Sequence, residues 1–337
     1  MKKIFTLFYI SLTIGLIFAV TGGIMVDRGE VNMGQIYDIL QENLNFGEKK
    51  VVFEQTEIPD ISDSENYTTD KNVTYPLNEF HTLELFAQSC KVEFKPTNAD
   101  DMRISLEYPK KLNGKVFLRT TVKNGSLRVL TTWTDTNVNS QDVVLTIEIP
   151  DNYKGGYSIN GTSAVIDICS LESSMDFAFN LLSSTVKTGA LSGGEFSFEL
   201  SGTTFNAENI SSRSGTVFYA ASSTMNIDTL NSAYTKLTAS TSTVTLKNIS
   251  GGITTDSQTS TLNLDFKNVG GNVSITAETG SVNIKIPHNA PVSLRHKENY
   301  STFKDNVKWT EKDSKNKDYK YIIDTNVKFS IVTLDEK

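Results

Sequence analysis

The amino-acid sequence predicts an all-β chain whose central part is a parallel β-solenoid of about seven two-strand coils, each roughly 19 residues long. Three observations predict this fold class. An apolar residue recurs at a nearly constant interval, strand-like alternation restarts at each recurrence, and a cluster of serine and threonine precedes most of them. The recurring residues are Ile166, Val186, Phe205, Met225, Val244, Leu262 and Val282, at spacings of 20, 19, 20, 19, 18 and 20. Each coil of a solenoid lies on the previous one, so equivalent residues stack in columns and a constant spacing is expected.

A second strand completes each repeat, because another run of alternating apolar residues lies between successive recurrences. These runs are Phe177 and Phe179, Phe196 and Phe198, Val217 and Tyr219, Leu237 and Ala239, Ile253 and Thr255, and Val273 and Ile275. Glycine pairs such as Gly193-Gly194 and Gly251-Gly252 separate the two strands and predict a turn there. A sandwich of hairpins also gives short strands, but it does not require one position to be apolar at a fixed interval. The solenoid is therefore favoured.

Polar residues in the same register predict the outer surface of the solenoid. One residue after the recurring positions stand Asp167, Lys187, Asn206, Asn226, Thr245, Asn263 and Asn283. Three residues after them stand Glu208, Asp228, Lys247, Asp265 and Lys285, whose charges alternate from Asp228 onward, as stacked neighbours prefer. Asn206, Asn226, Thr245, Asn263 and Asn283 form the candidate interaction face of the protein.

The amino-terminal residues 1–26 predict an uncleaved signal anchor, because Ile4 to Val26 is a run of 23 residues without a charge behind two lysines. A helix of that length covers roughly 35 Å, enough to span a hydrocarbon core of about 30 Å. A cleaved signal peptide is the alternative and would make the protein secreted, but the nearest cleavage-site candidates, between Ala19 and Gly23, are poor matches. The lysines predict a single-pass protein of the cell membrane whose remaining chain lies outside the cytoplasm.

The other regions are read from composition and strand pattern. Residues 27–78 predict a juxtamembrane segment and an extended linker, because Glu54 to Asp70 carries six acids and no Lys or Arg. Residues 79–160 predict a less regular β region with turns at Asn113-Gly114 and Asn124-Gly125. The repeats occupy 161–290, and 291–337 continues the β pattern. The first and last coils of a solenoid expose unpaired strand edges that must be covered. The two flanking β regions are therefore predicted to be irregular caps.

Composition excludes several function classes. The chain carries 32 Lys and Arg against 39 Asp and Glu, a net charge of -7, and shows no basic excess for binding nucleic acid. Cys90 and Cys169 could form a disulfide outside the cytoplasm, but two separate thiols are favoured, since the repeat register places Cys169 in an outward column. Two cysteines and three widely separated histidines predict no metal site and no cofactor.

Residues with catalytic or binding chemistry are few. Glu208 and Asp228 are the one stacked pair of acids in the repeats, and the neighbouring Lys247 indicates an ordinary mixed surface, so the prediction is a protein that is not an enzyme. The serine and threonine turn column, from Ser184 to Ser281, is expected to hydrogen-bond turn backbone groups. An ice-binding or glycan-binding hydroxyl array is its alternative. Trp133 and Trp309 could stack on sugars, although burial in a cap is expected.

The sequence resembles the LiaG-like putative adhesin family of bacterial envelope proteins. Three features carry the resemblance: the run LTIEIPDNY (Leu145 to Tyr153), the first repeat INGTSAVIDICSL (Ile159 to Leu171), and recurring coils of the form S/T-x-h-x-h-x-x-h, where h is apolar. Relatives of this kind carry Ser-Gly-Asp at the turn before each coil, whereas this chain has Ser-Ser-Thr or Thr-Ser-Thr. The resemblance covers Phe80 to the C terminus, is specific for fold, and implies an extracytoplasmic envelope protein without known catalytic residues.

Two functions fit these observations, and a third is disfavoured. The first is a non-enzymatic, membrane-anchored adhesin or envelope-binding protein that presents its polar strand faces to a cell-wall polymer or a surface glycan. The second is an envelope-stress accessory protein that acts through a membrane protein. A carbohydrate-active enzyme would need converging acids that the sequence does not indicate.

Overall fold

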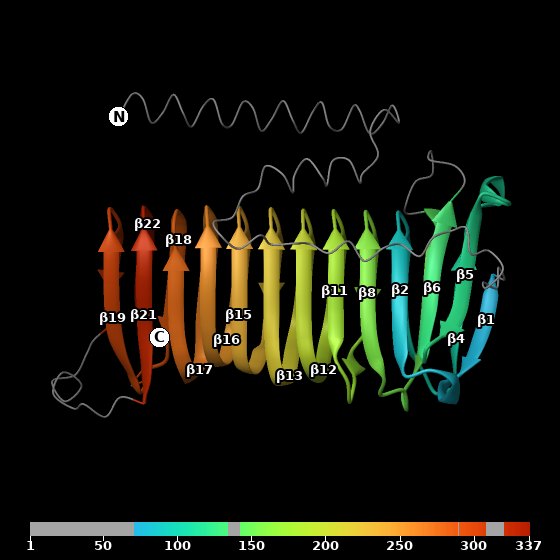
Figure 1. Cartoon of the computed structure of the whole chain (residues 1–337), viewed down its shortest axis with the longest axis horizontal. Coiled ribbons are helices and arrows are strands. Elements are labelled where there is room, and N and C mark those ends of the chain that lie inside the picture. The colour runs from blue at the N-terminus through green and yellow to red at the C-terminus, as the bar shows by residue number, and fades with distance from the viewer. Residues whose placement is uncertain (1–70, 134–141, 289, 308–319) are drawn as a thin grey trace, which may run out of the picture. The chain divides into compact units, whose positions relative to one another are not determined.

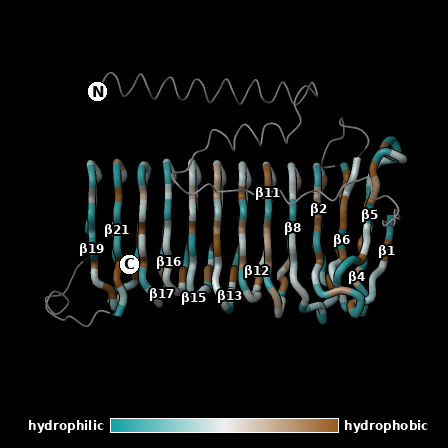
Figure 2. Tube along the Cα trace, viewed as in Figure 1, coloured by the Kyte–Doolittle hydropathy of each residue, from teal (hydrophilic) through white to brown (hydrophobic). Residues whose placement is uncertain are grey.

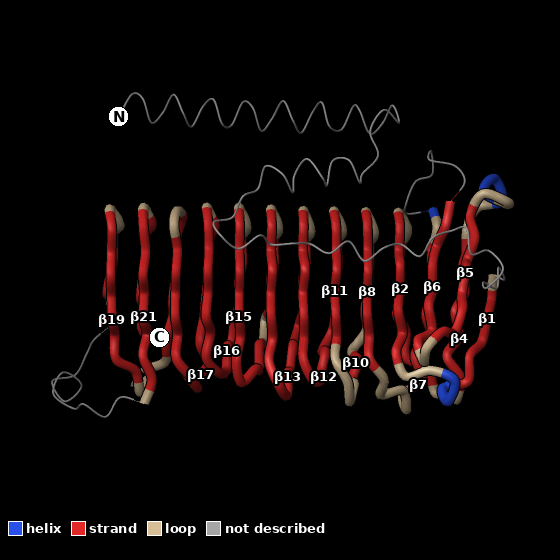
Figure 3. Tube along the Cα trace, viewed as in Figure 1, coloured by secondary structure: helices blue, strands red, loops and turns tan. Residues whose placement is uncertain are grey.

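The computed structural model describes residues 71–133, 142–288, 290–307 and 320–337. The predicted signal anchor, nearly all of the predicted acidic linker and Trp309 lie outside these ranges. No helix within the described ranges is long and apolar enough to cross a bilayer. These ranges include two short 3-10 turns, η2 (Leu77–Glu79) and η3 (Lys110–Leu112). Both lie near the amino-terminal end of the ladder of strands (Figure 3).

The described chain is all-β, as predicted, and its strands stack side by side in a long parallel ladder (Figure 1). The strands before the repeats are β1 (Asn72–Pro76), β2 (Thr82–Gln88), β3 (Lys91–Thr97), β4 (Asp101–Glu107), β5 (Val116–Lys123), β6 (Ser126–Trp133) and β7 (Val144–Pro150). The strands of the repeats are β8 (Gly156–Thr162), β9 (Val165–Ile168), β10 (Leu171–Glu172), β11 (Phe177–Leu182), β12 (Thr185–Ser201), β13 (Thr204–Ala221), β14 (Thr224–Ile227), β15 (Leu230–Ser240), β16 (Thr243–Gln258), β17 (Ser260–Ala277) and β18 (Gly280–Ile286). The last strands are β19 (Val292–Asn299), β20 (Thr302–Asp305), β21 (Tyr321–Lys328) and β22 (Ser330–Glu336).

The predicted stacking of the repeats is confirmed in register. Met225 pairs with Val244, and Val244 pairs with Leu262, in parallel strands. The whole predicted column, Ile166, Val186, Phe205, Met225, Val244, Leu262 and Val282, is paired in this way and fully buried. This column belongs to one strand row, here called sheet II, which runs β7, β3, β9, β12, β13, β14, β16, β17, β18, β22, β20. The other row, sheet I, runs β6, β2, β8, β11, β12, β13, β15, β16, β17, β21, β19.

In several repeats, one of the two predicted turns is a bend inside a continuous strand. β12, β13, β16 and β17 each run from sheet II through the bend into sheet I, so the same strand contributes to both rows. Gly193-Gly194 and Gly251-Gly252 lie at these bends, where the pairing register shifts. The prediction of a turn there was wrong, because the shift of one or two residues bends the strand while hydrogen bonding continues on both sides.

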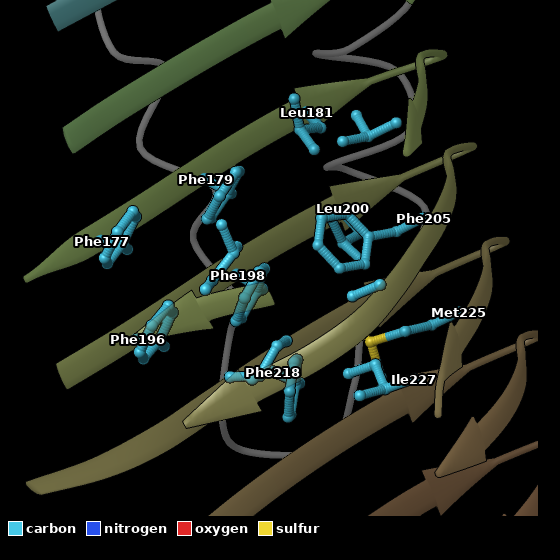
Figure 4. Close-up of a cluster of buried hydrophobic side chains, with 14 of the residues drawn as sticks. Phe177, Phe179, Leu181, Phe196, Phe198, Leu200, Phe205, Phe218, Met225 and Ile227 are labelled. Carbon is cyan, nitrogen blue, oxygen red and sulfur yellow. The ribbon is translucent and has the colours of Figure 1, made fainter. Parts of the chain in front are cut away.

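Aromatic side chains fill the space between the two rows in the first repeats (Figure 4). Phe177 and Phe196 stack with ring centroids 4.8 Å apart, and Phe179 and Phe198 stack at the same distance. Phe205 projects from sheet II against the edge of Phe198, with centroids 5.1 Å apart. The stacked rings therefore follow the strand spacing, and the edge-on contact joins the two sheets into one core.

The parallel ladder extends beyond the predicted repeats at both ends, in an order that differs from the chain order. β2 lies between β6 and β8, and β3 lies between β7 and β9. At the other end, β21 lies between β17 and β19, and β22 lies between β18 and β20. The predicted irregular caps thus contain regular coils. Antiparallel pairs within the described ranges, β1–β4, β4–β7 and β5–β6, occur at the amino-terminal end.

Candidate functional site

The turn between the two sheets places a row of hydroxyl groups inside the protein. Ser242 illustrates the arrangement: its Oγ accepts a hydrogen bond from the backbone N–H of Ser223 at 3.1 Å and donates to the carbonyl of Ser240 at 2.7 Å. Equivalent bonds link Ser184, Thr203, Ser223, Ser242 and Ser260, all buried. Because buried turn backbone groups need partners, this row is structural, as the sequence predicted.

The residue after each buried hydroxyl points the other way, to the outer surface of sheet II. Together with Ser281, which follows Gly280, these residues form a hydroxyl column in parallel register: Thr185, Thr204, Thr224, Thr243, Thr261 and Ser281. All of them are exposed or half-buried. Adjacent strands lie about 4.8 Å apart, so the column is a straight row of hydroxyls at that interval. The sequence prediction treated inner and outer hydroxyls as one cluster, because they are neighbours in the chain and only strand alternation separates them.

Two residues further along each strand, the predicted interaction residues form an amide column beside the hydroxyl column. Asn226 Nδ2 donates to Asn206 Oδ1 at 2.9 Å, and Asn283 Nδ2 donates to Asn263 Oδ1 at 2.8 Å. Asn263 Nδ2 also donates to Thr245 Oγ1 at 3.3 Å. The structure therefore brings all five predicted residues into one half-buried column on sheet II.

The amide column keeps hydrogen-bonding capacity for a ligand. A primary amide has two N–H donors and an oxygen with two acceptor sites, and a contact along the column uses one donor or one acceptor site. The contacts also hold the amides in fixed orientations, so little side-chain entropy remains to be lost on binding. Hydroxyl and amide columns together make an uncharged, ordered surface that runs along the repeats.

Charged residues border this surface. On one side, Lys247 Nζ lies 2.8 Å from Asp228 Oδ1, in the predicted column of alternating charge. At the amino-terminal end the amide column continues, through Lys187 and Asp167, to Glu93. Hydrogen bonds from Lys91 and Lys95 lower the pKa of Glu93, so this carboxylate stays ionised. The charged side chains at the borders of the uncharged surface are thus paired with side chains of opposite charge.

Glu208 and Asp228, the acids considered for catalysis, are both exposed on the repeats. Asp228 is paired with Lys247, in agreement with a mixed surface. In the described ranges, no group of three or more His, Cys, Asp or Glu side chains is placed to hold a metal ion. Trp133 donates its indole N–H to the carbonyl of Gln88 and packs against the core. Trp133 thus has a structural role.

The two cysteines are separate thiols, as favoured from the sequence. Cys90 is buried at the turn between β2 and β3, and burial raises its pKa to about 11. Cys169 is half-buried and packs against the core, which differs from the outward position predicted for it, and burial raises its pKa as well. Thiols with raised pKa values are poor nucleophiles.

Comparison with known proteins identifies the fold family. The family model described as Toastrack DUF4097 matches residues 80–334. A crystal structure of a putative cell adhesion protein from Clostridium sporogenes is 11% identical, with 81% of this chain and 100% of that chain covered and a TM-score of 0.23. A putative adhesin from Bacteroides fragilis is 10% identical, with 79% and 96% covered and a TM-score of 0.36. No curated protein matches the sequence.

Proposed function

We propose, from the premise that this chain belongs to the Toastrack DUF4097 family, that sheet II is a binding face for an uncharged, hydroxyl-rich polymer such as a cell-wall polysaccharide or a surface glycan. In this proposal the protein is a LiaG-like, non-enzymatic, adhesin-type member of the family. Residues 1–26 anchor it in the cell membrane, and the solenoid lies outside the cytoplasm.

One observation carries the proposal: the hydroxyl and amide columns run side by side, in register, along the repeats. A polymer with repeating hydroxyl groups could meet the same donors and acceptors at each coil, so individually weak contacts would add along its length. Neutral groups suit an uncharged ligand, because a charged one would lose hydration without a counter-charge. The compensated charges at the borders, Asp228 with Lys247 and Glu93 with two lysines, support the same ligand class.

Affinity electrophoresis in gels that contain hydroxyethyl cellulose, a soluble β-linked glucan, tests the proposal. The double variant Asn226→Val and Asn263→Val removes two amides from the column but keeps residues that favour strands. We expect retardation of the wild-type chain by the polymer, and roughly thirtyfold weaker binding by the variant, since it loses at least two hydrogen bonds that cost about 1 kcal/mol each.

The matched control carries Thr238→Val and Thr276→Val, which are half-buried outward positions on sheet I. This control should bind like the wild type. Insoluble peptidoglycan serves as a second probe in a sedimentation assay. Equal binding by all three proteins, or no binding of either polymer by the wild type, would refute sheet II as a glycan face and leave a membrane protein as the alternative partner.

A further inference from the structure

The carboxy-terminal end of the ladder presents two strand edges. β19 pairs with β21 in sheet I, and β20 pairs with β22 in sheet II. Among the described residues, no strand pairs with the opposite edge of β19 or of β20. Such an edge exposes backbone N–H and C=O groups in the spacing that another strand requires. Another strand can therefore pair with β19 or β20 at this end of the ladder.

An aromatic pair marks the same end. Tyr300 and Phe329 stack with ring centroids 5.5 Å apart and planes 8° apart, and their exposed fractions are 82% and 56%. Ile331, beside Phe329, is 50% exposed. Both aromatic residues occupy the left-handed backbone region, with φ of 52° and 51°, at the turn where the repeats have Ser, Thr or Gly. Bulky residues in that region are strained, and largely exposed rings gain little from burial, so the fold alone does not explain them.

Several outward side chains around this end are basic, although Asp305 at the end of β20 is also exposed. Arg295 and Lys297 project from β19, Lys304 projects from β20, and Lys328 lies at the turn, 5.7 Å from the centroid of the Phe329 ring. Asp324 on β21 lies beside Arg295, with Oδ2 3.9 Å from Nη1. An added strand would therefore place its outward side chains opposite cations, and acidic residues would be preferred at those positions.

We propose that the carboxy-terminal end of the solenoid is a docking edge for an extended acidic peptide segment of a partner protein. The segment adds as a further strand beside β19, its backbone pairs with the exposed edge, and its acidic side chains face Arg295 and Lys297. An apolar or aromatic residue at its end packs on the exposed face of Tyr300. This inference is independent of the proposed glycan face, because it uses the strand edges and not the outer surface of sheet II.

The charges argue against a second copy of this chain as the occupant. Head-to-tail stacking in sheet I would bring β19 against the outermost strand at the other end, β5, whose outward residues include Arg119 and Lys123. Like charges directly opposite each other destabilise a strand pair. The observations therefore favour a different, acidic chain.

Fluorescence anisotropy with two labelled eight-residue peptides, one alternating valine with glutamate and the other valine with lysine, tests the proposal at low ionic strength. The full chain should bind the glutamate peptide roughly tenfold more tightly than the lysine peptide. The double variant Arg295→Glu and Lys297→Glu should reverse this preference, which partial unfolding cannot produce. Tyr300→Ser should weaken binding about threefold to tenfold without changing the preference.

Two controls make the outcome decisive. Lys123→Glu, a charge reversal at the other end, and the Asn226→Val and Asn263→Val variant of sheet II should bind the peptides like the wild type. Equal affinity for both peptides, or a preference that the charge reversal at Arg295 and Lys297 leaves unchanged, would overturn the proposal. Concentration-dependent self-association that the same reversal strengthens would instead assign the edge to a second copy.

Discussion

The two ends of the ladder are built differently. At the amino-terminal end, antiparallel strands β5 and β4 continue the sheets, β1 extends one of them, and two 3-10 turns lie beside them (Figure 3). The other end stops at β19, which is largely hydrophilic (Figure 2), and at β20. Leu118 of β5 is 1% exposed, whereas Leu294 of β19 is only half-buried. Among the described residues β5 and β1 also pair on one edge only, so the two ends differ in the packing of their outermost layer and not in the presence of an unpaired edge.

The largest expected effect comes from a matched pair of core truncations at the two ends. Leu118→Ala should lower the free energy of unfolding by about 2–5 kcal/mol, because it leaves a cavity in a closed core. Leu294→Ala should cost about 1 kcal/mol, since that side chain is partly solvated already. Urea unfolding measures both. Equal costs would show that the carboxy-terminal end is as well packed as the amino-terminal end.

The turn hydroxyls give a second matched pair. Ser242 and Ser301 have the same role, since Ser301 Oγ accepts from the N–H of Ser330 and donates to the carbonyl of Asn299. Ser242→Ala should cost about 1–3 kcal/mol, because a buried N–H and a buried carbonyl lose their partner. Ser301→Ala should cost a few tenths of a kcal/mol, since water reaches the exposed turn. Thermal unfolding of both variants measures the difference, and a cost at Ser301 matching that at Ser242 would contradict an open end.

Backbone strain at the carboxy-terminal turns predicts a gain in stability. Phe329→Gly should stabilise the protein by about 1 kcal/mol, because glycine adopts the left-handed region without a steric penalty. The greater entropy of glycine in the unfolded chain offsets part of this gain. The reverse change, Gly202→Thr at φ 57° in the repeats, should destabilise it. A destabilised Phe329→Gly variant would show that the aromatic pair contributes to folding, which would weaken the case for a contact surface.

The smallest effect concerns the thiols, which report opening of the amino-terminal end. A maleimide at pH 8 should modify Cys169 faster than Cys90, because burial raises the pKa of Cys90 to about 11 and hides its sulfur. Cys90 should react only as fast as the end opens. Mass spectrometry of the digested protein measures the two rates. Comparable rates would show that the layer formed by β2 and β3 opens readily.

Much of the repeat region could be predicted, because its physics is local and periodic. The column from Ile166 to Val282 follows from equal spacing, and the amide column from Asn206 to Asn283 follows from strand alternation one residue away. The bend at Gly193-Gly194 was predicted as a turn, since glycine pairs mark turns and bulges alike. The distinction between buried Ser242 and exposed Thr243 was also missed, because both are small hydroxyl residues in one cluster.

The sequence by itself determined that this protein is a stacked β structure with an ordered polar face, because a solenoid repeats its core and its surface at every coil. Only the tertiary structure decided the order of the end layers, in which β2 lies between β6 and β8, and β21 lies between β17 and β19. The exposed edge of a parallel sheet accepts any strand of suitable length and alternation, so strand pattern alone does not specify the neighbour. Packing against the existing layers makes that choice, and with it which edge remains open at the carboxy-terminal end.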